Sequence, residues 1–194
     1  MTVVSFVILG LLLVLVVYGT TIFNGLVALR ENVKKSWSNI DVLLLQRHDE
    51  IPKLVEICKG YMKHERETLD LVMKARSAAW DAREHDDVAG VGAAETQMRA
   101  GLGRLFALSE NYPDLKANDT FMHLQARISS IEDQIADRRE LYNDAATLKN
   151  TRIQQVPDMI LARMFNFATS PLLEFEEAAL ARVDVGALFS ERAG

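Results

Sequence analysis

The sequence predicts an all-α protein, with an N-terminal transmembrane helix followed by an elongated antiparallel four-helix bundle. Three observations support this prediction. The first 29 residues carry no charge, and apolar residues recur at helical spacing along most of the remaining chain. Only four prolines and ten glycines occur in 194 residues, which favours long helices over a turn-rich β fold. Hydrophobic residues make up 49% and charged residues 25%, as is typical of a globular chain.

The first element, residues 1–24, is predicted to be a membrane anchor. Val3 to Phe23 contains no charged residue, and as a helix it would extend about 32 Å, enough to cross a bilayer core. A cleaved signal peptide would have a basic residue before the apolar run and small residues at a cleavage site. Because the chain has neither feature, we predict that the anchor is retained.

The charges that flank this run predict an orientation. Arg30, Lys34 and Lys35 follow the apolar segment, whereas no lysine or arginine precedes it. The positive-inside rule therefore places the N-terminus outside and the C-terminal bundle in the cytoplasm.

Residues 25–170 are predicted to form one helical bundle. From Leu26 to Ala79, apolar residues fall at positions i, i+3 and i+4, the core-facing pattern of a bundle helix. The pattern fails at Arg47 and Glu50, close to Pro52. Since proline removes a helical hydrogen bond, we expect a kink or an end at Pro52, with Asp49 as the cap of a new helix that runs to Arg83. The sequence leaves open whether the chain bends or reverses there.

The later part of the bundle is predicted from helix breakers and periodicity. A flexible connection from His85 to Gly92 should precede a helix over 93–111, in which Gly101 and Gly103 weaken the helix or let a neighbour approach closely. A long helix should begin at Asn118 or Asp119 and end before Pro157. Its predicted core face consists of residues at spacings of three and four: Phe121, Leu124, Ile128, Ile131, Ile135, Tyr142 and Ala145.

The last two elements are a short apolar helix and a tail. Residues 159–167 are mostly apolar with Arg163 as their one charge, so this segment is expected either to lie on the membrane or to pack against the end of the bundle. Residues 171–194 are predicted to be a C-terminal tail that begins at Pro171, with its structured part ending near Phe189.

Composition excludes several classes of protein. The formal net charge is −5 and no large basic patch is present, so we predict no nucleic-acid binding. The single cysteine, Cys58, cannot form an internal disulfide, and its place on the apolar stripe indicates a core residue.

A series of short blocks runs along the chain. They are Phe23-Asn24-Gly25-Leu26-Val27, Trp37-Ser38-x-Ile40-Asp41-Val42, Arg47-His48-Asp49-x-Ile51-Pro52-x-Leu54-Val55-Glu56, Gly60-Tyr61-x-x-His64-Glu65, Tyr112-Pro113-Asp114-Leu115-Lys116-Ala117-Asn118, Arg138-Arg139-x-x-Tyr142-Asn143 and Phe175-Glu176. In this order they resemble the LemA family of bacterial membrane proteins, from about Phe23 to Phe189. The chain departs from the family at Leu43, Leu44 and Leu45, where polar or basic residues are usual, and at Leu148, where a tyrosine is frequent.

The resemblance implies a single N-terminal span in the bacterial inner membrane, a long antiparallel helical bundle, and an N-out, C-in topology. The family is not known as an enzyme family. One relative takes part in building the magnetosome membrane, which suggests a role in membrane organisation.

The residues offer no motif for catalysis or metal binding. Di-iron bundles use Glu-x-x-His pairs, but no carboxylate stands three residues before any of the four histidines. No His-x-x-x-His pair is present for zinc, and no Gly-x-Ser-x-Gly or phosphate-binding glycine motif occurs. We therefore predict no catalytic residue, no cofactor, no metal ligand and no enzymatic activity.

The polar and aromatic members of the blocks are the candidate structural or interaction residues. We expect caps, ion pairs and solvated faces for most of them, with a buried polar network or partner contact as the alternative. Arg138 occupies an expected core slot and would then need a buried partner, whereas Trp37 is expected in the core. The set consists of Trp37, Asp41, His48, Asp49, Pro52, Glu56, His64, Arg138, Arg139, Tyr142 and Asn143.

Two functional hypotheses follow. The first is a membrane-anchored, non-catalytic scaffold that associates with itself or with a membrane or cytoplasmic protein, through an apolar strip such as Leu43 to Leu45 or residues 159–167. The expected partners are then the lipid bilayer and a second copy or another protein. The alternative is a bundle enzyme or a ligand or metal carrier with an unrecognised site.

Overall fold

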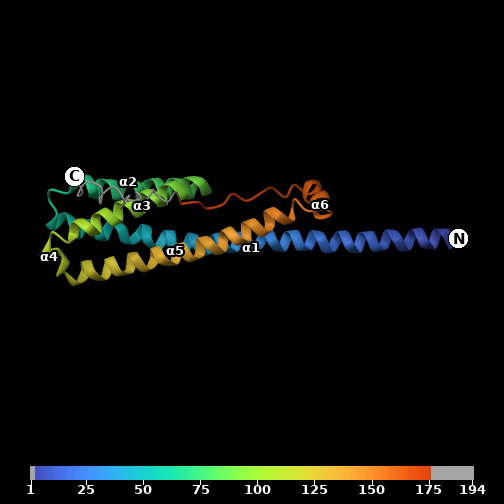
Figure 1. Cartoon of the computed structure of the whole chain (residues 1–194), viewed down its shortest axis with the longest axis horizontal. Coiled ribbons are helices and arrows are strands. Elements are labelled where there is room, and N and C mark those ends of the chain that lie inside the picture. Colours follow the sequence, from blue (N-terminus) through green and yellow to red (C-terminus); the bar gives the residue numbers. More distant parts are fainter. Residues whose placement is uncertain (1–2, 176–194) are drawn as a thin grey trace, which may run out of the picture. The chain divides into compact units, whose positions relative to one another are not determined.

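The computed structural model describes residues 3–175, which form six α-helices and no strand (Figure 1). The prediction of an all-α fold is confirmed. The helices are α1 (Val3–Tyr61), α2 (Arg66–Glu84), α3 (Val88–Ser109), α4 (Pro113–Lys116), α5 (Asp119–Arg152) and α6 (Asp158–Met164).

The sequence predicted that a helix kinks or ends at Pro52, but helix α1 does not end there. It continues through Pro52 to Tyr61, and the chain turns over residues 62–65 before α2 begins at Arg66. The predicted helix from Pro52 to Arg83 is therefore wrong, and Asp49 is an exposed residue inside α1 rather than a cap.

The proline is tolerated because its missing hydrogen bond is replaced. Pro52 has no N–H to donate to the carbonyl oxygen of His48, four residues earlier. The Nε of Arg76, on α2, donates to this oxygen at 2.9 Å. The helix can continue because the acceptor that Pro52 leaves open is satisfied from a neighbouring helix.

Helix α3 begins earlier than predicted. The turn between α2 and α3 is short, and Asp87 caps α3 by accepting a 3.0 Å hydrogen bond from the N–H of Gly90. Gly90 and Gly92 thus lie inside the helix rather than in a flexible connection. A Cβ at Gly101 would lie 2.8 Å from Leu71 Cδ2, so this glycine permits the close approach of α2 and α3, whereas a Cβ at Gly103 would meet nothing within 4 Å.

Helix α5 matches its prediction closely. The side chain of Asn118 accepts a 3.0 Å hydrogen bond from the N–H of Phe121, which makes Asn118 the N-cap. Every residue of the predicted core face, from Phe121 to Ala145, is buried. The helix ends at Arg152, five residues before Pro157.

The described residues divide into two compact units. The anchor unit comprises residues 3–44 and 132–172, and the bundle unit comprises residues 45–131 and 173–175. In the bundle unit, α2 and α3 run side by side (Figure 1), and the core draws residues from α1, α2, α3, α4 and α5. The largest fully buried side chains of this core include Leu54, Met98, Leu102 and Phe121.

In the anchor unit, the segment after α6 is held against α5 by polar contacts. Tyr142 donates its hydroxyl to the carbonyl of Pro171 at 2.8 Å, and Lys149 donates to the hydroxyl of Ser170 at 2.6 Å. Asn150 bonds both the N–H and the carbonyl of Ser170 at 2.8 Å. Residues 171–175 are not helical, and the rest of the predicted tail, including Phe189, lies outside the described residues.

Candidate membrane-proximal site

The N-terminal part of α1 presents an apolar surface on all sides. Every large apolar side chain from Val3 to Tyr18 is more than half exposed. The helix is long and apolar enough to cross a membrane, and its most apolar window is not buried by any other described part of the chain. Such a surface is unfavourable in water, so this segment indicates a membrane-associated protein.

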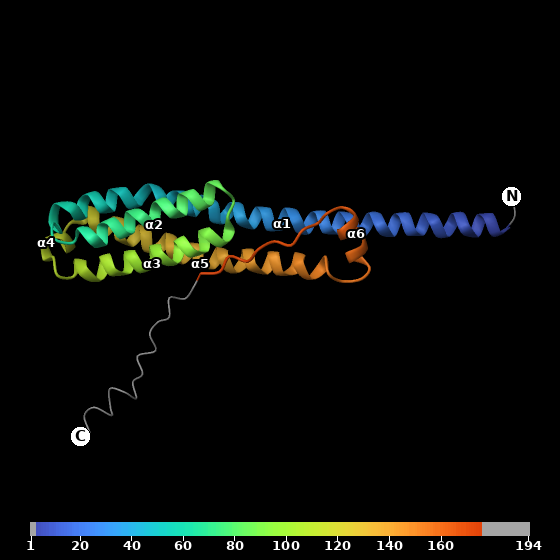
Figure 2. The ribbon, with the colours of Figure 1, turned by 90° about the horizontal axis from the view of Figure 1, so that it is seen from above.

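Helix α6 packs against α1 where this apolar segment ends (Figure 2). The rings of Phe23 and Phe165 meet edge to face with centroids 4.7 Å apart, and those of Phe23 and Phe167 are 6.0 Å apart. Ala162 is buried in the same contact. Residues 159–167 therefore pack on the protein, which was one of the two expected alternatives.

The same short helix keeps part of its apolar surface exposed. Ile160 and Met164 are each 62% exposed, and Phe165 is 51% exposed despite its contact with Phe23. The position of α6 is fixed at its first turn, where Arg152 forms an ion pair with the buried carboxylate of Asp158. An ordered helix with outward apolar side chains beside a candidate span is suited to contact with lipid.

A groove of about 260 Å³ lies beside the contact of Phe23 with Phe165, between α1 and α6. Three of its lining residues, Gly19, Thr20 and Phe23, belong to α1. The others, Leu161, Met164 and Phe165, belong to α6 and its C-terminal end. The hydroxyl of Thr20 donates to the carbonyl of Val16 at 2.8 Å, so its donor is satisfied within the helix.

Basic groups accompany this apolar region. The guanidinium of Arg30 lies 5.6 Å from the ring centre of Phe167 and pairs with Glu31 at 3.2 Å. Lys149 is almost fully buried, and burial, together with the positive charge of Arg30, lowers the pKa of its ammonium group. Arg163 is exposed in the last turn of α6. The anchor unit thus combines the exposed apolar side chains of α1 and α6 with cationic side chains.

The candidate residues of the anchor unit fall into two groups. Trp37 is half-buried, and its ring lies 5.4 Å from that of the buried Tyr142. Asp41, Arg139 and Asn143 are half-buried and take part in polar or electrostatic contacts. Arg138, expected in the core, is exposed, because α5 turns this position away from the packed face.

The candidate residues of the bundle unit do not form one cluster. His48 packs against the ring of Trp80 with centroids 4.4 Å apart, and its Nε2 lies 2.6 Å from a terminal nitrogen of Arg76. Asp49, Glu56 and His64 are exposed, and Glu56 pairs with Lys59 at 3.3 Å. Pro52 is half-buried.

A buried ion pair in the bundle unit was not predicted from the sequence. Arg47 and Glu95 are both almost completely buried and form an ion pair between α1 and α3. Glu50 is also buried and bonds to Lys53 at 3.1 Å and to Arg127 at 3.2 Å. The available signal was the failure of the apolar pattern at Arg47 and Glu50, since a charged residue in a core slot needs a buried partner. Leu43 and Leu44 are buried too, so Leu45, which is 38% exposed, is the one member of the expected apolar strip that lies at the surface.

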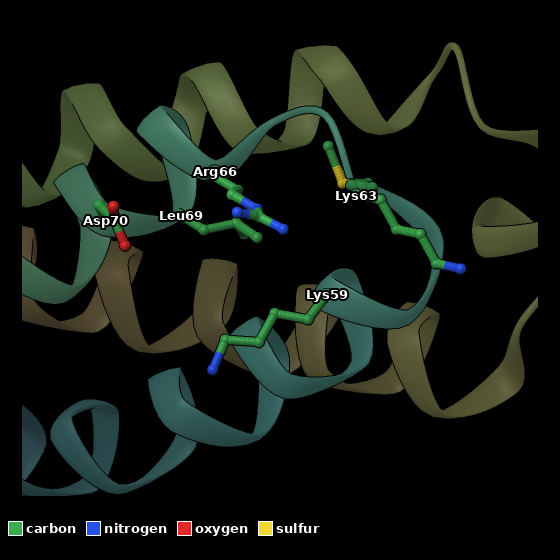
Figure 3. Close-up of a pocket in the computed structure, with 6 residues that line it drawn as sticks. Lys59, Lys63, Arg66, Leu69 and Asp70 are labelled. Atoms are coloured by element: carbon green, nitrogen blue, oxygen red, sulfur yellow. The ribbon is translucent and has the colours of Figure 1, made fainter.

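A second depression lies at the α1–α2 turn of the bundle unit (Figure 3). It has a volume of about 380 Å³ and is lined by Lys59, Met62, Lys63, Arg66, Leu69 and Asp70. Met62 and Leu69 are also members of the hydrophobic core, so the depression borders that core.

Residues 3–175 do not bring three or more His, Cys, Asp or Glu side chains together as metal ligands. Cys58 is fully buried, and burial raises the pKa of its thiol to about 11. A thiol with so high a pKa is a poor nucleophile at neutral pH.

Known proteins resemble this sequence over most of its length. The model of the LemA family matches residues 36–186. "Magnetosome protein MamQ 2" of Paramagnetospirillum magneticum is 24% identical, over 87% of this chain and 71% of that protein. "Magnetosome protein MamQ" of Magnetospirillum gryphiswaldense is 25% identical, over 79% of this chain and 66% of that protein. "Protein LemA" of Metamycoplasma hominis is 27% identical, over 84% of this chain and 72% of that protein.

Proposed function

This chain belongs to the LemA family, and we propose that it is a membrane-anchored, non-catalytic scaffold. In this proposal α1 crosses the bacterial inner membrane with its N-terminus outside, and the remaining helices act in the cytoplasm. The protein works through self-association or through a protein partner at the membrane surface, in the organisation of that membrane. The similarity to proteins named as magnetosome proteins supports the proposal of a role in membrane organisation.

The observation that carries the proposal is apolar surface in two places. The apolar part of α1, whose large side chains are all more than half exposed, suits lipid, and further apolar side chains remain exposed outside it. Leu141 and Leu148 lie seven residues apart on α5 and are 51% and 56% exposed. Positions seven residues apart share a face of a helix, so these leucines form a stripe that a second copy or a partner helix can cover.

The stripe on α5 allows a direct test of self-association. Because native Cys58 is buried and has a raised pKa, a cysteine introduced at an exposed position is the reactive one. We expect Leu148→Cys to give covalent dimers when native membranes are treated with a short bismaleimide. Gln97→Cys, exposed on α3, serves as the matched control and should stay monomeric. Equal reaction of both variants would show random collision, and no dimer with Leu148→Cys would exclude contact between copies at this stripe.

The Gln97→Cys variant also tests the orientation. If the bundle is cytoplasmic, a membrane-impermeant maleimide should label this cysteine only after the cells are lysed. Labelling in intact spheroplasts would place the bundle outside and contradict this part of the proposal.

A further inference from the structure

The groove between α1 and α6 lies at the depth of a membrane boundary if α1 spans the bilayer. Residues 3–23 of the helix account for about 32 Å, enough to cross the hydrocarbon core. Gly19, Thr20 and Phe23, which line the groove, belong to the last turns of that length. The groove would therefore open where acyl chains meet the headgroups of one leaflet.

The chemistry of the groove suits an apolar chain. Phe23, Leu161, Met164 and Phe165 supply apolar contacts, and the hydroxyl of Thr20 is already bonded to Val16. Gly19 leaves space, because a Cβ at this position would meet no atom within 4 Å. Water gains few hydrogen bonds in such surroundings, so it is displaced readily by hydrocarbon.

The surroundings of the groove indicate that its apolar ligand comes from a membrane lipid. Tyr18, which precedes the groove on α1, and Ile160 and Met164 on α6 are all more than half exposed and apolar, so the groove is continuous with the surface that faces lipid. Arg30, over the ring of Phe167, and Arg163, next to Met164 in the sequence, carry the positive charge that attracts a lipid phosphate.

We propose that this groove binds an acyl chain of a membrane phospholipid and that the bound lipid holds the outer face of α6 at the membrane. Lipid then completes the packing between α1 and α6 that Phe23 and Phe165 begin. The inference rests on the proposed membrane anchoring, and it goes further by assigning a site and its ligand.

The test uses the full chain in liposomes that contain a phosphatidylcholine with a diazirine on its acyl chain. After illumination, labelled peptides are mapped by mass spectrometry. We expect labelling at residues 161–165, and we expect excess unlabelled phospholipid to reduce it. Labelling at 161–165 that does not exceed the non-specific level on residues 3–10 would overturn the proposal.

A matched pair of glycine variants makes the test specific. Gly19→Leu fills the groove, while Gly10→Leu adds the same side chain at another position of α1 where a Cβ also meets nothing within 4 Å. We expect Gly19→Leu to reduce labelling of residues 161–165 to the non-specific level and Gly10→Leu to leave it unchanged. Equal labelling in the two variants would contradict the assignment.

A second variant and a membrane assay separate the possible failures. Met164→Asp places a charge in the groove at a mostly exposed position, so the fold should persist, as checked by circular dichroism, while specific labelling is lost.

Extraction with alkaline carbonate reports on anchoring alone. Chains that resist extraction but show no specific label would refute only the lipid site, whereas extractable wild-type chains would refute the anchor itself. Cross-links from 161–165 to another copy of the protein in place of lipid would assign the groove to self-association.

Discussion

Arg76 donates a hydrogen bond from its Nε to the carbonyl oxygen of His48 at 2.9 Å. This oxygen is the one that Pro52 cannot reach with a backbone N–H, because proline has none. A contact between α2 and α1 therefore compensates for a proline within α1. It allows this helix to run from Val3 to Tyr61 without a break.

The coupling between Arg76 and Pro52 is measurable. Arg76→Met removes the donor and leaves the His48 carbonyl without it, so we expect a loss of about 1–3 kcal/mol in the free energy of unfolding. Pro52→Ala restores a backbone N–H to the same carbonyl. In the Pro52→Ala background the Arg76→Met substitution should therefore cost about 1 kcal/mol less. Denaturant unfolding in detergent, followed by circular dichroism, gives the double-mutant cycle, and strict additivity would contradict this account of Pro52.

The same contact predicts a pH dependence. Burial lowers the pKa of His48 below 6.5, with further lowering by Arg76 and Arg83 and an opposing effect of Asp49. Since arginine only donates, the Nε2 that faces Arg76 is the unprotonated nitrogen of a neutral ring. As the pH falls below 6.5, the unfolded chain takes up a proton more readily than the folded one, and stability decreases.

This contribution is fully present above pH 6.5 and is lost on acidification toward the lower pKa of the folded state. We expect the Tm of the wild-type protein to fall between about pH 7.5 and about pH 5.5, and His48→Asn to make this part of the profile flatter. Parallel profiles for the two proteins would exclude His48 as the titrating group.

The buried pair of Arg47 and Glu95 predicts asymmetric costs. Arg47→Met leaves the carboxylate of Glu95 buried without its counter-charge, and one oxygen of that carboxylate, Oε2, already has no hydrogen-bond partner. We expect a loss of about 3–5 kcal/mol for this single change and recovery of most of it in the double variant Arg47→Met with Glu95→Leu. If the double variant were as unstable as the single one, the pair would contribute more than charge compensation.

Two glycines of α3 should respond in opposite ways to the same substitution. Gly101→Ala introduces a methyl group 2.8 Å from Leu71 Cδ2 and 3.2 Å from Val72 Cγ2, so overpacking should cost about 1–3 kcal/mol. Gly103→Ala meets nothing within 4 Å and should stabilise the helix by about 0.5–1 kcal/mol. Thermal unfolding of both variants checks the contrast, and a stabilised Gly101→Ala would show that α2 and α3 have room between them.

Much of the fold could be predicted because hydrophobic periodicity reports burial directly. The seven apolar positions predicted for the core face of α5 are all buried, whereas Arg138, in an expected core slot, is exposed. The start of this helix was predicted at Asn118 or Asp119, and Asn118 is its cap. The continuation of α1 through Pro52 could not be predicted, because it depends on Arg76, which is 24 residues away in the sequence. The helical state of Gly90 and Gly92 was missed for a related reason. Asp87 caps the helix at Gly90, and the backbone of Glu174, far away in the sequence, lies where a Cβ of Gly92 would stand.

The candidate site was predictable only in part. The apolar character of residues 159–167 was evident, whereas their division into a face against Phe23 and an exposed face needed the position of α6. Arg138 and Arg47 show the limit of periodicity when several charged residues interrupt one stripe. The interruption at Arg47 marks a buried pair with Glu95, while that at Arg138 marks an exposed position.

The measurement that tests the central proposal most directly is the native mass of the full chain in detergent, with metal analysis of the same sample. A scaffold that works by association predicts a defined multimer, or a stoichiometric complex with another protein, that contains no stoichiometric metal. A monomer without a partner, or a monomer that carries a stoichiometric metal or small molecule, would contradict the scaffold.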